Sequence, residues 1–191
     1  LLSLAVACPA RLSPRILSAL ISREGASVRI FITGNAGAGK TTLAKDLAAQ
    51  LSVPAFHLDQ IVWQPHWQKA PEHERAEALE QITQTENWII EGVSEVVRLK
   101  ADLTIFLDVP RFICLLRCLK RNLPYLFRSR PELPAHCPEI LIFPRLIRII
   151  WNFPHLVGKR LSLEANHSNN IRVATNKEQV ADTLNEFRSL A

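Results

Sequence analysis

The chain has 191 residues, of which 48% are hydrophobic and 21% charged, so it can bury the core of one domain without disulfides or metals as cross-links. Its formal net charge is +5, and the basic residues concentrate in residues 111–160, where ten lysines and arginines stand against two glutamates. Such a segment suits nucleotide phosphates, nucleic acid or a membrane surface, and charge alone does not choose among them.

The cysteines and the apolar segments argue for a cytoplasmic protein. Cys8, Cys114, Cys118 and Cys137 show no C-x-x-C pairing, and we interpret them as reduced thiols. Cys114, Cys118 and Cys137 together with His136 would be the residues of a metal site, although cysteine serves more often as a small buried hydrophobic residue. No uninterrupted apolar run reaches the roughly 18 residues of a membrane-spanning helix, so we expect no membrane partner.

The sequence contains no methionine, and a strand pattern begins abruptly at Val28. Our hypothesis is that translation starts at Val28 from a non-standard start codon. Residues 1–27 would then be upstream readthrough or a loose extension, and residues 28–191 would form the folded domain.

Hydrophobic periodicity alternates between strand and helix along the domain. In chain order it predicts a strand at 29–33, a helix at 41–51, a strand at 55–59, a helix at about 71–84, strands at 88–92 and 103–110, a helix at about 111–122, a strand at 171–176 and a helix at 177–190. Residues 123–160 hold six prolines and are expected to form short helices and loops. The apolar run 140–150 is expected to pack a lid or a dimer rather than to bind a membrane. This alternation predicts an α/β fold of three layers, in which a parallel five-stranded sheet has helices on both faces and a helical lid insertion at about 111–160.

Three of the six glycines stand between the first strand and the first helix. Gly34, Gly37 and Gly39 precede Lys40 and Thr41 in the pattern G-x-x-x-x-G-K-[ST], the phosphate-binding loop of P-loop NTPases. Glycines let successive backbone N–H groups point at a phosphate, and the helix that follows adds the positive end of its dipole. The predicted nucleotide-binding residues are Gly34, Asn35, Ala36, Gly37, Ala38, Gly39, Lys40, Thr41 and Thr42.

Each polar side chain of this loop has an expected role. Lys40 reaches the β- and γ-phosphates, Thr41 ligates Mg²⁺, and Thr42 lies near the α-phosphate. The chain has no N-K-x-D motif for reading guanine, which argues against a GTPase. ATP with Mg²⁺ is therefore the expected cofactor.

Transfer of a phosphoryl group to an acceptor requires more positive charge and a lid that excludes water. Arg117 and Arg121 lie four residues apart on one face of a predicted helix, where a phosphate-clamping lid would begin; the alternative is a solvated basic face. Asp59, at the end of the second strand, either orients or deprotonates an acceptor hydroxyl or has a capping role.

Four further residues have two interpretations each. Trp63 and Trp67 either stack on a base or sugar or pack under a mobile flap. Asp108 either supports the phosphate loop or forms a turn before Pro110. His57 is expected to pack beside the sheet rather than to act in catalysis.

Six segments occur in order along residues 28–190: GNAGAGKTTLAKDLA, FHLDQIVWQPHW, WIIEG, ADLTIFLDVPRFICLLRCLKR, RPELPAHCPE and IIWNF. In these segments the chain resembles the bacterial DNA topology modulation proteins (FlaR-type), which are adenylate-kinase-like P-loop kinases. The resemblance implies an ATP-binding fold of the nucleotide- or nucleoside-kinase kind, and Arg117 and Arg121 match the lid arginines.

The resemblance also implies a second magnesium-site residue. Glu91 stands where the relatives have an aspartate that holds magnesium-bound water, and glutamate lengthens that side chain. Val93, Ser94 and Glu95 stand where the relatives continue with an arginine that grips an acceptor phosphate, and Arg98 is the candidate substitute.

The sequence as a whole predicts a P-loop kinase with Lys40, Asp59, Arg117 and Arg121 as catalytic residues and with Thr41 and Glu91 at Mg²⁺. Its acceptor would be a small molecule, a nucleoside or a nucleotide. The alternative is an ATP-binding or ATP-hydrolysing regulator linked to DNA topology, which grips nucleic acid through residues 111–160. The sequence leaves the oligomeric state open.

Overall fold

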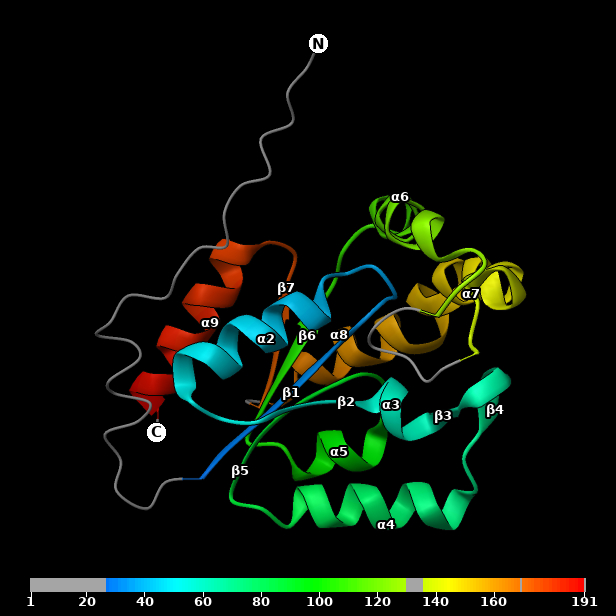
Figure 1. Cartoon of the computed structure of the whole chain (residues 1–191). Helices are drawn as coiled ribbons and strands as arrows, with labels where there is room; N and C mark the ends of the chain where they lie inside the picture. The colour runs from blue at the N-terminus through cyan, green and yellow to red at the C-terminus, as the bar shows by residue number, and fades with distance from the viewer. Residues whose placement is uncertain (1–26, 130–135, 169, 191) are drawn as a thin grey trace.

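The structure is a computed structural model, and it describes residues 27–129, 136–168 and 170–190. The expected extension at residues 1–27 lies outside the described residues except for Ser27. The domain is built on five parallel strands in the order β2-β5-β1-β6-β7 (Figure 1). The strands are β1 (Val28–Gly34), β2 (Ala55–His57), β5 (Asn87–Glu91), β6 (Leu103–Leu107) and β7 (Ile171–Ala174).

The helices lie on both faces of this sheet. α2 (Lys40–Leu51) and α9 (Lys177–Leu190) cover one face, and α4 (Glu72–Thr83) and α5 (Glu95–Lys100) cover the other (Figure 1). Successive strand residues point to opposite faces, so Ile30 and Ile32 join the core beneath α2 while Phe31 joins the core of the α4 and α5 side. The three-layer α/β fold predicted from the sequence is confirmed.

Several short elements follow β2. α3 (Leu58–Val62) begins directly after that strand, so the second strand ends at His57, two residues earlier than predicted. β3 (Trp63–Gln64) and β4 (Gln68–Lys69) then form a small antiparallel ribbon around the turn η1 (Pro65–Trp67). The short helices α3 and α5 and the two-residue strands β3 and β4 were not predicted, because they carry too little periodicity for a sequence pattern to detect.

A helical hairpin rises beyond the carboxyl ends of the central strands. α6 (Arg111–Asn122) ends in the turn η2 (Leu123–Tyr125), and α7 (Glu139–Phe153) returns alongside α6 (Figure 1). Two contacts make the pair antiparallel: Phe112 packs edge-on against Trp151, with ring centroids 5.5 Å apart, and Asn122 bonds Glu139 at the other end. We call this pair the α6–α7 hairpin.

The expectation of only short helices and loops at 123–160 is wrong. α7 continues through η3 (Pro154–Gly158), a π-helical stretch, into α8 (Lys159–Ala165), so helix runs from Glu139 to Ala165. Pro144 and Pro154 each remove one backbone donor without ending the helix, because Ile150, Phe153 and Leu161 bury apolar area against the domain. By length and apolar composition alone this helix is comparable to a membrane span.

Candidate active site

The loop from Gly34 to Gly39 connects the central strand β1 to α2. Close approaches require glycine at Gly34 and Gly37, and a positive φ favours it at Gly39. Gly37 has a φ of 82°, and a Cβ there would collide with the backbone carbonyl of Cys114 in α6. Gly39 has a φ of 104° and begins α2. The phosphate loop therefore lies directly against the first helix of the α6–α7 hairpin.

Lys40 is folded back into its own loop. Its Nζ donates to the carbonyl oxygens of Gly34, at 3.1 Å, and Asn35, at 3.0 Å. Burial lowers the pKa of Lys40 below its usual value of 10.5, while the negative charges of Glu91 and Asp59 act to raise this pKa and the positive charge of Arg121 to lower it. These groups come from β5, α3 and α6, so predicted site residues from three elements converge on the lysine.

Glu91 forms a polar cluster with residues at the end of β2 and the start of α2. The hydroxyl of Thr41 donates to Glu91 Oε1 at 3.0 Å, and Nδ1 of His57 lies 3.0 Å from the same oxygen. His57 pairs with Glu91 in the register of β2 and β5, which places the two side chains next to each other. The expectation that His57 packs beside the sheet missed its contact with Glu91. In the sequence, only the position of His57 near the end of the second strand, two residues before Asp59, pointed to the site.

Thr41 and Glu91 suit Mg²⁺, since both present oxygen atoms, the donors that this ion prefers, and they are in contact. Among the described residues no group of three or more histidine, cysteine or acidic side chains is arranged to hold a metal. The alternative site of Cys114, Cys118, His136 and Cys137 is therefore not formed. A magnesium ion at Thr41 would take its remaining ligands from phosphate and water.

The phosphate loop is also tied to α7. Asn35 is buried and donates its Nδ2 to the carbonyl oxygen of Ile150 at 2.9 Å, while its Oδ1 accepts from the N–H of Ala36. In a regular helix the carbonyl of Ile150 would accept from residue 154, but Pro154 has no N–H to donate. The proline thus makes a helix carbonyl available to the loop, a contact that sequence analysis missed.

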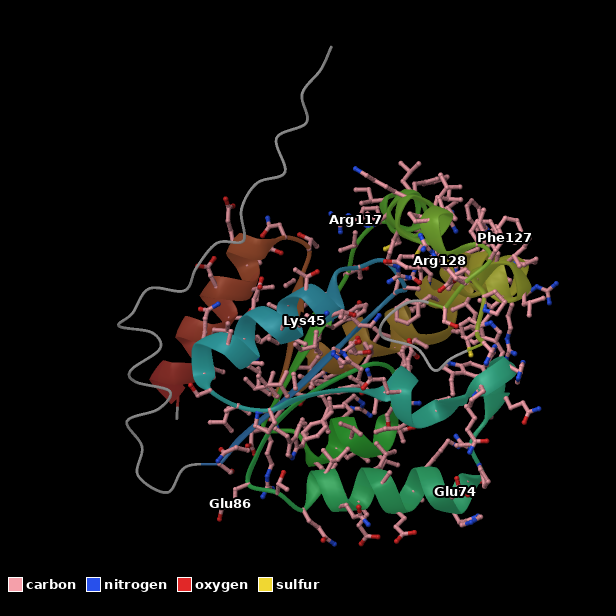
Figure 2. The ribbon with its side chains drawn as sticks, in the orientation of Figure 1. Lys45, Glu74, Glu86, Arg117, Phe127 and Arg128 are labelled. Atoms are coloured by element: carbon pink, nitrogen blue, oxygen red, sulfur yellow. The ribbon has the colours of Figure 1, made fainter. Side chains whose placement is uncertain are left out.

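The two lid arginines of α6 face different parts of the site. Arg117 lines a cavity beside α2, and Figure 2 shows it on α6 above the sheet. Arg121 lies close enough to Lys40 to act on its pKa. Nε of Arg121 donates to Oδ1 of Asn122, and Nδ2 of Asn122 donates to the buried carboxylate of Glu139 at 2.9 Å. Asn122 therefore connects Arg121 to the start of α7.

The cavity has a volume of about 550 Å³, within the usual range of ligand pockets. It opens beside the phosphate loop between α2, the end of β6 and the loop after β7. Its lining is mainly apolar and includes Leu43, Leu107, Val109, Arg117 and Val180. A flat base would fit between these apolar side chains and the Arg117 guanidinium.

Burial also determines the state of the cysteines behind the lid. Cys114, Cys118 and Cys137 are buried and form no disulfide among the described residues, as predicted for reduced thiols, while Cys8 lies outside the described residues. Burial raises the pKa of Cys114 to about 11, and the neighbouring Cys118 raises it further, against the opposing effect of Arg117. The Cys114 thiol is therefore protonated at neutral pH and packs as an apolar group.

The structure brings Asp59 to the site but not Arg98. Asp59 is exposed on α3, and its charge acts on Lys40. Arg98 instead pairs with Glu164 of α8 at 2.7 Å and with Glu95 at 3.5 Å. Arg98 therefore joins two helices and does not replace an acceptor-binding arginine.

Trp63 and Trp67 pack with each other, with ring centroids 5.4 Å apart. Nε1 of Trp67 donates to the carbonyl of Pro138, and Arg145 lies 6.0 Å from the ring of Trp63. These contacts fasten the β3–β4 ribbon to the start of α7. Of the two interpretations, the structure favours packing over base stacking.

Asp108 forms part of the turn after β6. Its side chain is exposed, its backbone N–H donates to the carbonyl of Ala174, and its charge is felt by Cys114. These contacts agree with the interpretation of Asp108 as a turn residue.

No protein-family model matches the chain, and no curated protein matches it. Among solved structures, a shikimate kinase from Bacteroides thetaiotaomicron has a TM-score of 0.51 and 22% identity, with 86% of this chain and 98% of that chain covered. An uncharacterized protein from Eubacterium ventriosum has a TM-score of 0.50 and 12% identity, with 86% and 99% covered. A shikimate kinase from Acinetobacter baumannii follows, with a TM-score of 0.49, 20% identity, and 87% and 93% covered.

At these identities the likeness establishes the fold alone. The resemblance to the DNA topology modulation proteins stays a prediction. What the sheet order and the structural matches establish is that the chain has the fold of the P-loop small-molecule kinases.

Proposed function

We propose that the chain is an ATP-dependent phosphotransferase that transfers the γ-phosphoryl group to a hydroxyl of a small molecule. The observation that carries this proposal is the contact of Glu91 with Thr41 beside the loop-bound Lys40, whose pKa also responds to the charges of Asp59 on α3 and Arg121 on α6. A nucleotide switch needs the phosphate loop and the magnesium site. Only transfer to an acceptor also needs a base at the acceptor side and a cation over the migrating group.

In the proposed complex the base of ATP occupies the cavity lined by Arg117, and the phosphates follow the loop to Lys40. Lys40 exchanges its bonds to the carbonyls of Gly34 and Asn35 for phosphate oxygens. Thr41 and Glu91 hold Mg²⁺, which supplies charge neutralisation at the β- and γ-phosphates. Arg121 stabilises the charge that develops on the transferring group.

Asp59 faces the acceptor in this proposal and accepts the proton of the attacking hydroxyl. The ion pairs of Arg98 with Glu164 and Glu95 leave this arginine without a role at the acceptor. We therefore favour an acceptor without a phosphate group, a nucleoside or another polyol, over a nucleotide. The structural neighbour from Bacteroides thetaiotaomicron is named as a shikimate kinase, and that name supports a small hydroxyl acceptor in general, without identifying this one.

The decisive variant replaces Arg121 by glutamine and leaves Arg117 in place, because Arg117 lines the cavity proposed for the base and its loss would weaken ATP binding. Arginine contacts to a transferring phosphoryl group are worth about 10³-fold or more in rate, so kcat should fall steeply, whereas ATP affinity should stay within a few-fold. Lys120→Gln is the matched control, because it removes an exposed cation from the same helix. Transfer is followed with labelled ATP and a panel of nucleosides and polyols, and ATP affinity by calorimetry.

The competing regulator hypothesis predicts the opposite pattern for the same variant. ATP turnover would persist, and salt-sensitive DNA binding would be lost, since gripping about six or more phosphates gives a steep dependence on salt. That result would overturn the kinase proposal.

A further inference from the structure

α6 presents its apolar side to solvent. Its inward face carries Cys114, Cys118 and Asn122, all buried against the domain. Its outward face carries four large apolar side chains, whose exposed fractions are 59% for Phe112, 66% for Leu116, 39% for Leu119 and 69% for Leu123. Surface helices of globular proteins normally turn the apolar stripe inward, so this reversed arrangement requires an explanation.

The apolar surface continues across the hairpin onto α7. Trp151 packs edge-on against Phe112, and Ile140 and Ile147 are exposed along the same helix. Phe127 is 84% exposed in the turn between the two helices, where Figure 2 shows it at the outer end of the hairpin, away from the sheet. We call this surface the outer face. It is defined by Phe112, Leu116, Leu119, Leu123, Phe127, Ile140, Ile147 and Trp151.

The charged groups around the outer face are cationic. Arg111 lies 4.2 Å from the ring of Trp151, and Arg128 follows the exposed Phe127 in the chain. Two more cations, Lys120 and Arg148, are exposed on α6 and α7, whereas Arg145 lies against Trp63 of the β3–β4 ribbon. Among the described residues of 111–129 and 136–153 the only acidic side chain is Glu139, which is fully buried and bonded by Asn122. Within the described residues of the hairpin, the outer face therefore combines apolar side chains with positive charge that no exposed carboxylate offsets; Glu132 lies outside the described residues.

The combination of apolar side chains and positive charge indicates which kind of partner binds the outer face. A second copy docking through the same face would bring cations against cations, with no exposed carboxylate among the described residues of either hairpin to compensate. Nucleic acid would pair with the cations but leave the phenylalanine and leucine side chains against phosphate and water. An anionic bilayer surface suits both the apolar and the cationic side chains. The apolar side chains enter the boundary between head groups and acyl chains, while lysine and arginine reach lipid phosphates.

We propose that the outer face of the α6–α7 hairpin docks the protein on an anionic phospholipid surface. The docked helices lie in the plane of the interface, with Trp151 and Phe112 at the level of the head groups. Docking does not cover the candidate active site, because the opposite side of α6 contacts the phosphate loop at Gly37. This inference goes beyond the proposed function and holds whatever molecule accepts the phosphoryl group.

Vesicle flotation tests the proposal, with phosphatidylcholine vesicles compared with vesicles that also contain phosphatidylglycerol. Binding should require the anionic lipid and weaken as salt is raised. Lipids brominated along the chain should quench the fluorescence of the protein, and Trp151→Phe should remove that quenching. Equal binding to neutral vesicles, or no binding at low salt, would overturn the proposal.

Variants then assign the binding to this face. The double substitution Phe112→Ser with Leu116→Ser should reduce partitioning by about tenfold or more, and Lys120→Glu should reduce it by roughly twenty-fold. Leu99→Ser on α5 and Lys69→Glu on β4 are the matched controls, since both residues are exposed outside the hairpin. Controls that lose as much binding as the hairpin variants would contradict the assignment.

Two further measurements keep the test decisive. Lys120→Glu changes an exposed side chain, so it reports even where the apolar double variant fails to fold, which circular dichroism would reveal. Light scattering of the vesicle-free protein gives the oligomeric state. A concentration-dependent dimer that the double variant abolishes would identify a second copy as the occupant and overturn the lipid proposal.

Discussion

Lys40 is held in an electrostatically unfavourable state by its surroundings. Its ammonium group is removed from water and bonded to two carbonyl oxygens, and burial lowers its pKa. Phosphate oxygens would give the Lys40 ammonium group a negatively charged partner in place of the two neutral carbonyl oxygens. The lysine therefore gains more from ATP than an exposed lysine would gain.

This state predicts a pH dependence of ATP binding. The cationic form of Lys40 binds phosphate, so the affinity for ATP is fully present below the lowered pKa of Lys40. This affinity is lost as the pH rises through that pKa, at a pH below the usual lysine value of 10.5. Bound phosphate raises the pKa again, so binding in that window should take up a proton. Calorimetry in buffers of different ionisation heat measures this uptake, and Lys40→Arg, which stays charged, should show none from this residue. Absence of proton uptake up to the usual pKa of lysine would contradict the account.

Asp59 allows a second test at the residue scale. Asp59→Asn keeps the shape of the side chain but removes the base, so ATP affinity should be retained while the transfer rate falls by about 10² or more. Asp108→Asn, which changes an exposed carboxylate in the turn after β6, is the control and should leave the rate unchanged. Equal transfer rates in Asp59→Asn and the parent protein would return Asp59 to a structural role.

At the scale of elements, the sequence predicted α6 and α9 with the observed bounds, and β1, β5 and β6 within a few residues. These segments succeed because one strong periodicity runs through each of them and clear breakers follow. The helix at Glu139–Ala165 could not be predicted in the same way. Local rules interpret Pro144 and Pro154 as breaks, whereas the continuation depends on burial of Ile150, Phe153 and Leu161 against distant parts of the chain.

The link between α6 and α7 gives a prediction about the lid as an element. Asn122→Leu keeps the volume but removes the partner of Arg121 and of the buried Glu139 carboxylate. Loss of a buried hydrogen bond to a charged group should destabilise the fold by about 1–3 kcal/mol, measured by chemical denaturation. Because Arg121 loses its support, kcat should also fall with ATP affinity preserved.

Asn152→Leu, at an exposed position of α7, is the control for this substitution. An Asn122→Leu protein that is less stable but keeps its parent kcat would show that Asn122 supports the fold and not the arginine.

At the scale of the whole molecule, the candidate site is assembled by the sheet. The phosphate loop was predictable because its residues are contiguous and its spacing is specific. The contact of His57 with Glu91 joins residues 34 positions apart, and the contact of Asn35 with Ile150 joins residues 115 positions apart. Such contacts follow from strand order and from the path of α7, which no local pattern contains.

The central claim is phosphoryl transfer from ATP to a small hydroxyl acceptor, and the most direct measurement is a transfer assay. ATP labelled at the γ-phosphate is incubated with Mg²⁺, the protein and a panel of nucleosides, polyols and nucleotides, and the labelled products are separated. The account predicts label on the hydroxyl of at least one acceptor, abolished in Lys40→Ala and reduced in Asp59→Asn. Label released only as inorganic phosphate, at a rate that no acceptor changes, would contradict the account.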